Sequence, residues 1–108
     1  MMFAKLAKHV RIKPRAAARP TVEEQRHLDR VASMICIGCG AWKVEIHHAM
    51  KVPGKIRRRD NRFVVPLCAE CHRGDSGVHG LGSEAAFKLK TGVDIAENAI
   101  DLWENRHV

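Results

Sequence analysis

Two pairs of cysteines are the residues of this sequence with the most distinctive chemistry. They are Cys36 and Cys39, then Cys68 and Cys71, each pair spanning a Cys-x-x-Cys motif, with 28 residues between the pairs. Each motif brings two thiolates to one side of a tight turn, and two motifs complete a tetrahedral site of four sulfurs. The N-terminal stretch lacks the apolar segment of an export signal, so a reducing compartment is expected, which disfavours disulfides. The spacing therefore predicts a structural zinc ion (Zn²⁺), with disulfides as the alternative.

Histidines are the second set of candidate ligands, because the first site uses every cysteine. Of the seven histidines, four lie inside or just beyond the cysteine framework: His47, His48, His72 and His79. The first two are adjacent, so one imidazole can face a metal ion while the other points elsewhere. We expect the remaining three to face solvent: His9, His27 and His107. The cluster predicts a second metal site, with scattered surface histidines as the alternative.

The charge of the chain indicates the kind of partner. Nineteen Lys and Arg against 12 Asp and Glu give a formal net charge of +7 in 108 residues. Such an excess favours a polyanionic partner, nucleic acid before membrane, although solubility alone is the alternative. No run of about 18 apolar residues is present, so no membrane span is expected. The length predicts a single domain.

The elements that must position these residues follow from local patterns. Residues 1–20 carry six Lys and Arg and no acid, and are expected to form a flexible basic arm before a domain at 21–108. A capping box at Thr21 predicts a helix. Strands are expected at 42–46, ending at the paired histidines, and at 63–65, closed by Pro66. A basic loop at 49–62 joins them. A short helix is expected at 69–72, and two further helices are expected at 83–90 and 94–105. Together with the strands they give an α+β fold.

The order of these motifs resembles the HNH endonucleases. A Cys-x-x-Cys motif, a strand ending in His-His, a basic loop with Asn61, a short strand and then Pro-Leu-Cys-x-x-Cys-His occur between residues 36 and 79. The resemblance implies a small ββα-metal (His-Me finger) domain, braced by the four-cysteine zinc and flanked by helices. The chain is most similar to small phage-encoded HNH proteins of the Ref kind, which are recombination-associated nucleases.

The resemblance also implies a role for each residue. His48 would be the general base that takes a proton from the attacking water, and Asn61 would orient it through the loop backbone. The ligands of the catalytic ion would be His47, His72 and His79. That ion would be Mg²⁺ or another divalent ion (Mn²⁺, Zn²⁺ or Ni²⁺), which stabilises the leaving oxygen during phosphodiester hydrolysis. His48 must stay off the metal, since a coordinated nitrogen cannot accept a proton.

The spacing of the last two ligands departs from the family pattern. His72 and His79 are seven residues apart, whereas family members commonly place these ligands four apart. Glycine disfavours a helix by about 1 kcal/mol relative to alanine. We therefore expect the helix to break at Gly74 and Gly77 and a loop to present His79. Asn61 or a water is the alternative ligand at that position.

The basic loop is expected to contact backbone phosphates rather than bases. Its candidate contacts are Lys51, Lys55, Arg57, Arg58, Arg59 and Arg62. A solvated surface is the alternative.

The sequence thus predicts a metal-dependent DNA endonuclease of low sequence specificity. It would be monomeric, act in phage DNA processing or recombination, and work in the cytoplasm, that of the host if phage-encoded. Its partners would be DNA and a recombinase–DNA filament. The alternatives are a non-catalytic zinc-ribbon module that binds nucleic acid or protein, and a processing factor for single-stranded or branched DNA that needs a recombinase partner for activity.

Overall fold

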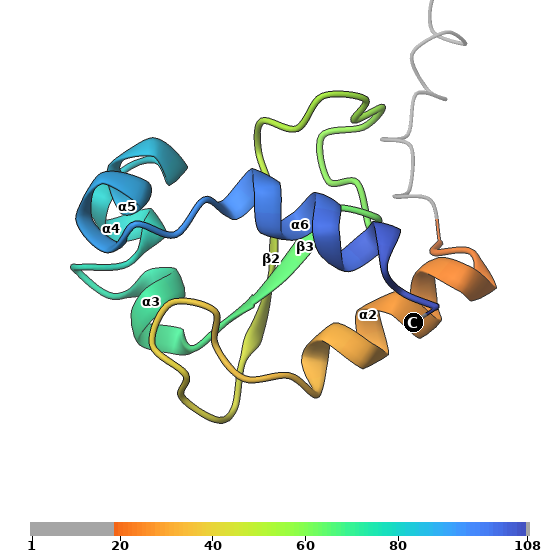
Figure 1. Cartoon of the computed structure of the whole chain (residues 1–108), viewed down its shortest axis with the longest axis horizontal. Coiled ribbons are helices and arrows are strands. Elements are labelled where there is room, and N and C mark those ends of the chain that lie inside the picture. The colour runs from red at the N-terminus through yellow and green to blue at the C-terminus, as the bar shows by residue number, and fades with distance from the viewer. Residues whose placement is uncertain (1–18, 108) are drawn as a thin grey trace, which may run out of the picture.

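Two short antiparallel strands cross the middle of the molecule, and the helices are arranged around them (Figure 1). The computed structural model describes residues 19–107, so the basic arm expected at 1–20 lies almost wholly outside the described residues. The described elements are α2 (Val22–Ala32), β2 (Glu45–His48), β3 (Val64–Leu67), α3 (Ala69–Arg73), α4 (Val78–Leu81), α5 (Glu84–Thr91) and α6 (Ile95–Glu104). The arrangement is α+β, as predicted.

The first strand differs from the prediction in its bounds. β2 begins at Glu45 rather than Trp42, whose side chain is 72% exposed, and it contains both His47 and His48 instead of ending before them. His47 pairs with Val65 of β3, and His48 pairs with Val64. Because successive side chains of a strand point to opposite faces, the two adjacent imidazoles diverge.

Pro66 lies inside β3 rather than closing it, which also corrects the prediction. It pairs with Ile46, and its carbonyl accepts a hydrogen bond from the Ile37 amide at 3.1 Å. That carbonyl therefore points away from β2, and so does the position where an N–H would stand. The missing donor costs the β2–β3 ladder no hydrogen bond.

Helix α2 begins at the predicted capping box. The Glu24 amide donates to Thr21 Oγ1 at 3.1 Å, and the Thr21 amide donates to Glu24 Oε1 at 3.0 Å. The buried face of the helix consists of Val31 and, four residues earlier, His27. His27 is 0% exposed, so the expectation that it faces solvent is wrong. Its ring lies edge-on against Trp103 of α6, with centroids 5.0 Å apart.

The predicted helix break between His72 and His79 is confirmed. α3 ends at Arg73, and the chain turns through Gly74–Gly77 into α4, so a short helix rather than a loop presents His79. Glycine is required in this turn and in α4 because the two helices approach closely. A Cβ on Gly77 would lie 2.4 Å from the Glu70 carbonyl oxygen, and one on Gly80 would lie 2.2 Å from that of Gly74.

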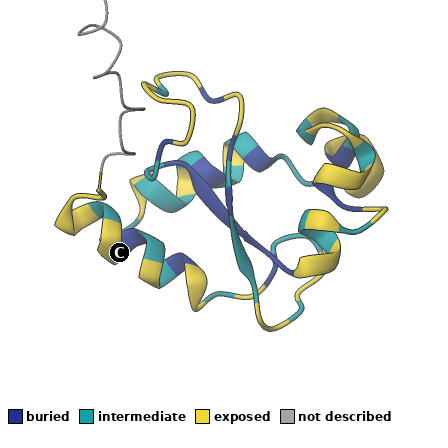
Figure 2. Ribbon diagram, turned by 180° about the vertical axis from the view of Figure 1, so that it is seen from behind, coloured by how far each residue is buried: buried dark blue, intermediate teal, exposed yellow. Residues whose placement is uncertain are grey.

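The core lies between the sheet and the helices. α6 crosses over the strands in Figure 1, and it packs on β3, as does α2. Figure 2 shows β3 buried and much of the helices' outer surface exposed. Among the fully buried side chains are Phe87, Leu67, Ile95, Val31, Val64 and Val65. Across residues 19–107, no helix combines the length and the apolar character needed to cross a bilayer.

Candidate metal centres and catalytic site

The fold brings all four predicted cysteines together. The sulfurs of Cys36, Cys39, Cys68 and Cys71 lie within 4.8 Å of one another, and none forms a disulfide. The Cys39 and Cys68 sulfurs are 3.6 Å apart. With Zn–S bonds of about 2.3 Å, two ligands of a tetrahedral zinc would lie about 3.8 Å apart. The cluster can therefore hold a metal ion, and its donor set fits zinc.

Local structure places both cysteine motifs. In the first, the Gly40 amide donates to the Cys36 carbonyl at 2.8 Å, and Gly40 takes a φ of 79°, which favours glycine. The hydrogen bond from Ile37 to Pro66 attaches this turn to β3. In the second, Cys68 is the N-cap of α3, and its sulfur accepts from the Cys71 amide.

The pKa values in the cysteine cluster indicate that four thiolates would need a bound cation. Burial, together with the neighbouring sulfurs, raises the pKa of Cys71. Burial also acts to raise the pKa of Cys36, but hydrogen bonds from the backbone outweigh it and lower that pKa to about 7. Sulfurs this close cannot all carry negative charge unless a positive ion neutralises them.

Three of the four predicted histidines form a second cluster. His47 from β2, His72 from α3 and His79 from α4 place one ring nitrogen each within 4.8 Å of the others. The ring centroids are 5.2 Å apart for His47 and His72, 5.7 Å for His47 and His79, and 4.7 Å for His72 and His79. Three converging imidazoles can hold a divalent metal ion.

Two carboxylates that the sequence analysis missed contact this cluster. Glu84 Oε2 lies 2.7 Å from His47 Nε2, and Glu45 Oε1 lies 2.7 Å from His72 Nδ1. Hydrogen bonds from Arg73 and then His72 lower the pKa of Glu45 to about 2. Burial acts to raise the pKa of Glu84, but hydrogen bonds from His47 and the Met50 amide outweigh it and lower that pKa. Both groups are therefore carboxylates at neutral pH.

Asn61 contacts the His48 ring directly. The resemblance had implied that Asn61 acts through the loop backbone instead. His48 Nε2 and Asn61 Oδ1 are 2.8 Å apart, so Nε2–H donates and Nδ1 keeps its lone pair. Burial lowers the pKa of His48; the Asn61 hydrogen bond opposes this, and the charge of Arg59 adds to the lowering. A neutral imidazole with a free lone pair can accept a proton near neutral pH.

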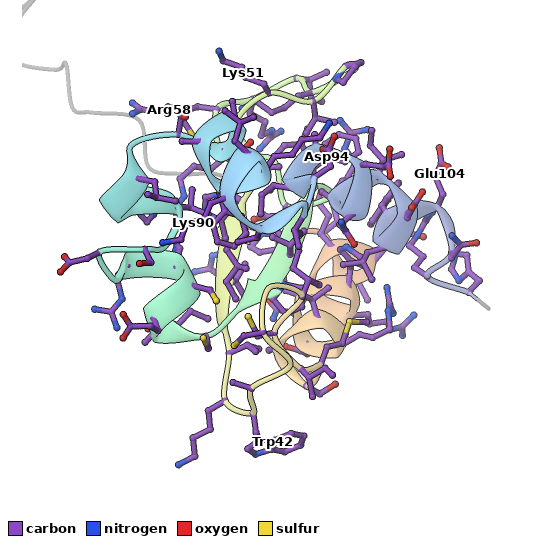
Figure 3. The ribbon with its side chains drawn as sticks, turned by 60° about the vertical axis from the view of Figure 1, so that its left-hand side comes forward. Trp42, Lys51, Arg58, Lys90, Asp94 and Glu104 are labelled. Carbon is purple, nitrogen blue, oxygen red and sulfur yellow. The ribbon has the colours of Figure 1, made fainter. Side chains whose placement is uncertain are left out.

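One cleft joins these groups. Its volume is about 440 Å³, and it is lined by His47, His48, His72, His79, Arg58 and Arg59, with Ile46 and Met50. Figure 3 shows Lys51 and Arg58 at the same end of the molecule, with Trp42 at the opposite end. The cleft therefore combines an imidazole that can accept a proton, three imidazoles that can hold a metal ion and two cationic side chains.

Two predicted phosphate contacts are engaged within the loop itself. The Lys55 ammonium donates to the carbonyl oxygens of Met50 at 2.6 Å and Arg58 at 3.1 Å. Arg62 donates to both carboxylate oxygens of the buried Asp60, at 3.0 and 2.7 Å. These contacts hold the loop in shape and leave Lys51, Arg57, Arg58 and Arg59 exposed on it.

None of the family models, curated proteins or solved structures compared with this chain matches it.

Proposed function

We propose that this chain is a metal-dependent endonuclease of the HNH type that hydrolyses DNA phosphodiester bonds. The observation that carries the proposal is the cleft lined by His48, which Asn61 holds, and by the cluster of His47, His72 and His79. A zinc ribbon that only binds has no need of a neutral histidine held beside three further imidazoles. The resemblance between residues 36 and 79 and the HNH order agrees with this chemistry.

The chemistry divides among the residues of the cleft. His48 Nδ1 takes a proton from the attacking water, while Asn61 holds the ring through Nε2. His47, His72 and His79 would hold a divalent ion, Mg²⁺ or Mn²⁺ for example, which when bound supplies charge stabilisation at the leaving oxygen. Arg58 and Arg59 lie at the cleft wall and would bind phosphate oxygens on either side of the scissile bond.

The cysteine cluster has a separate, structural part in the proposal. Zinc held by Cys36, Cys39, Cys68 and Cys71 would fix β3 and the start of α3, and hence the position of His72. The identity of the polyanion as DNA rests on the net charge of +7 and on the resemblance. Contacts to phosphate oxygens carry no sequence information, so low sequence specificity is expected.

The test compares two histidine variants with a control. His48→Ala is expected to lower the rate of DNA cleavage in Mg²⁺ or Mn²⁺ by about 10²–10⁴-fold, with zinc content and DNA affinity unchanged. His72→Ala is expected to weaken binding of the divalent ion, so that excess metal partly restores cleavage. His107→Ala removes an exposed histidine outside the cleft and is expected to cleave like wild type.

The substrates should be duplex, nicked, branched and single-stranded DNA, each with and without a recombinase filament. Cleavage by His48→Ala at the wild-type rate would overturn the mechanism. A wild-type protein that binds DNA but cleaves none of these substrates would favour the alternative, a non-catalytic zinc-ribbon module.

A further inference from the structure

Each of the two carboxylates beside the histidine cluster contacts one ring nitrogen of a histidine in it. Glu84 Oε2 accepts from His47 Nε2, and Glu45 Oε1 accepts from His72 Nδ1, each at 2.7 Å. An ionised carboxylate can only accept, so each of these nitrogens carries the proton. The nitrogen with the lone pair is then Nδ1 in His47 and Nε2 in His72.

Glu84 is well placed to hold His47 still. Its side chain is 13% exposed, and the side chain of His47 is 4% exposed. The same oxygen, Oε2, also accepts from the Met50 amide at 2.9 Å, so Glu84 ties the first turn of α5 to the chain just after β2. The carboxylate thus has a backbone donor besides the imidazole, and this second hydrogen bond holds it in place beside the ring.

Glu45 acts from the strand that carries His47. It lies two residues before His47, on the same face of β2, and from there reaches across to α3. Arg73 holds both oxygens of Glu45, with Nε to Oε1 at 2.9 Å and Nη2 to Oε2 at 2.6 Å. This support fixes the carboxylate even though its side chain is 34% exposed.

Neither carboxylate is itself part of the ligand cluster. Within residues 19–107, the group that converges there consists of His47, His72 and His79 alone. An ion bound by three neutral imidazoles keeps its positive charge. A carboxylate hydrogen-bonded to the far nitrogen of an imidazole makes that imidazole a stronger electron-pair donor to the ion.

We infer that Glu84 and Glu45 are positioning residues of the divalent-ion site, which set His47 to coordinate through Nδ1 and His72 through Nε2. The inference rests on the proposed function, because that proposal supplies the divalent ion at this site. The two histidines therefore present opposite ring nitrogens to the site, and each depends on its own carboxylate. Removing one such partner typically weakens metal binding by about 10–100-fold.

The first experiment needs neither metal at this site nor activity. Long-range ¹H–¹⁵N spectra of the zinc-loaded wild type, free of other divalent ions, report which nitrogen of each histidine carries the proton. The expected result is Nε2–H for His47 and Nδ1–H for His72. A spectrum with His47 protonated on Nδ1, or His72 on Nε2, overturns the inference.

The second experiment measures Mn²⁺ affinity by paramagnetic resonance, with the structural zinc retained. Glu84→Gln and Glu45→Gln are each expected to lower the affinity by about 10–100-fold. Glu84→Asp keeps the negative charge and is expected to retain part of the Mn²⁺ affinity that Glu84→Gln loses. Glu104→Gln is the matched control, because Glu104 projects from the far end of α6 in Figure 3 and should bind Mn²⁺ like wild type.

The outcomes separate this inference from the proposed function. Wild-type affinity in both Gln variants overturns the inference, whether or not the protein cleaves DNA. The expected tautomers together with weakened Mn²⁺ binding support it even if no DNA substrate is cleaved, in which case only the proposed function fails. A wild-type protein that binds neither Mn²⁺ nor Ni²⁺ at the histidines overturns both. If Glu84→Gln does not fold, the histidine tautomers of the wild type and the Mn²⁺ affinity of Glu84→Asp still test the inference.

Discussion

Adjacent histidines can serve two tasks because they lie on one strand. His47 points to the face of β2 that meets α3 and α4, whereas His48 points to the other face and contacts Asn61. A helix would direct two neighbouring side chains about 100° apart, and a flexible loop would fix neither. The strand therefore keeps the proposed base off the metal while leaving both rings on the same cleft.

The candidate metal ligands could be predicted from residue type and spacing, whereas the carboxylates that contact them were not. The four cysteines and the cluster of His47, His72 and His79 were identified from type and spacing, and the fold brings each set together. Glu84 could not be identified, because it is 37 residues from His47 and acidic residues are common. Glu45 had a signal that was overlooked: it shares the period-2 face of His47.

His27 was misplaced for a different reason. A search for an apolar helix stripe counts only apolar residues, and this stripe contains a histidine four residues before Val31. Burial of His27 leaves Nδ1 accepting from Arg30 Nη2 at 2.7 Å, and Nε2 without a hydrogen-bond partner among the described residues. A neutral ring fits this position, and a charged one does not.

The pH dependence of stability should report His27. Burial, then the charges of Arg30 and Arg106, lower its pKa to about 4. Between pH 6.5 and 4 the unfolded chain binds the proton more tightly, so stability is complete above pH 6.5 and falls as the pH drops toward 4. We expect His27 alone to contribute a loss of about 2 kcal/mol in the free energy of unfolding between pH 7 and pH 5.

Urea denaturation with excess zinc measures this loss. His27→Gln should show a shallower decline over the same interval, while His107→Gln, which alters an exposed histidine, should keep the wild-type decline. The two carboxylates with pKa values of about 2, Glu45 and Asp60, lose their contribution only at lower pH. Equal declines in all three proteins would contradict the assignment to His27.

At the scale of elements, the helices could be predicted more closely than the strands. Caps mark a helix start by side-chain hydrogen bonds within a few residues, as at Thr21, Ser83 and Asp94. Strand ends depend on pairing with a distant segment, so β2 moved from the predicted 42–46 to Glu45–His48. The α3–α4 break was predictable from glycine, but the helical turn at His79 forms through contacts with α3 that no local pattern encodes.

The close approach of α3 and α4 predicts a specific effect of Gly80→Ala. The added Cβ would stand 2.2 Å from the Gly74 carbonyl oxygen, so α4 and His79 must shift. We expect a destabilisation of about 1–3 kcal/mol and weaker Mn²⁺ binding, with zinc retained. Ser76→Ala, which changes an exposed residue of the same turn, is the control. Mn²⁺ affinity in Gly80→Ala equal to that of the control would contradict a role for His79 as a ligand.

Zinc at the two cysteine motifs would connect the segment that follows α2 to the start of α3, which predicts the effect of zinc removal. Cys36 is 2% exposed and follows α2, and Cys68 caps α3. Purified protein should contain about one zinc ion per chain that resists dialysis, and Cys36→Ser or a strong chelator should unfold it. Cys39→His should keep zinc more weakly, because Cys₃His sites also hold the ion. Circular dichroism and metal analysis test this; normal folding in chelator would remove the structural-zinc proposal.

At the scale of the whole molecule, cationic side chains of the loop between β2 and β3 lie at the same end as the cleft. Lys51 and Arg58 project at the end opposite Trp42 in Figure 3, and Arg58 and Arg59 line the cleft. The net charge alone indicated a polyanionic partner, but it could not say which cations would remain available. Lys55 and Arg62 are engaged inside the loop, which leaves the exposed arginines as the best candidates for phosphate.

The salt dependence of DNA binding distinguishes local contacts from net charge. Each phosphate that a side chain neutralises contributes about 0.9 to the slope of log affinity against log salt. The double variant Arg58→Gln/Arg59→Gln should therefore reduce the slope by up to about 2. Lys43→Gln/Lys90→Gln removes the same charge from exposed positions outside the cleft and should leave the slope nearly unchanged. Fluorescence anisotropy with a labelled duplex at increasing salt measures both. If the two double variants reduce the slope equally, DNA responds to the total charge of the molecule, and the cleft arginines have no special contact with phosphate.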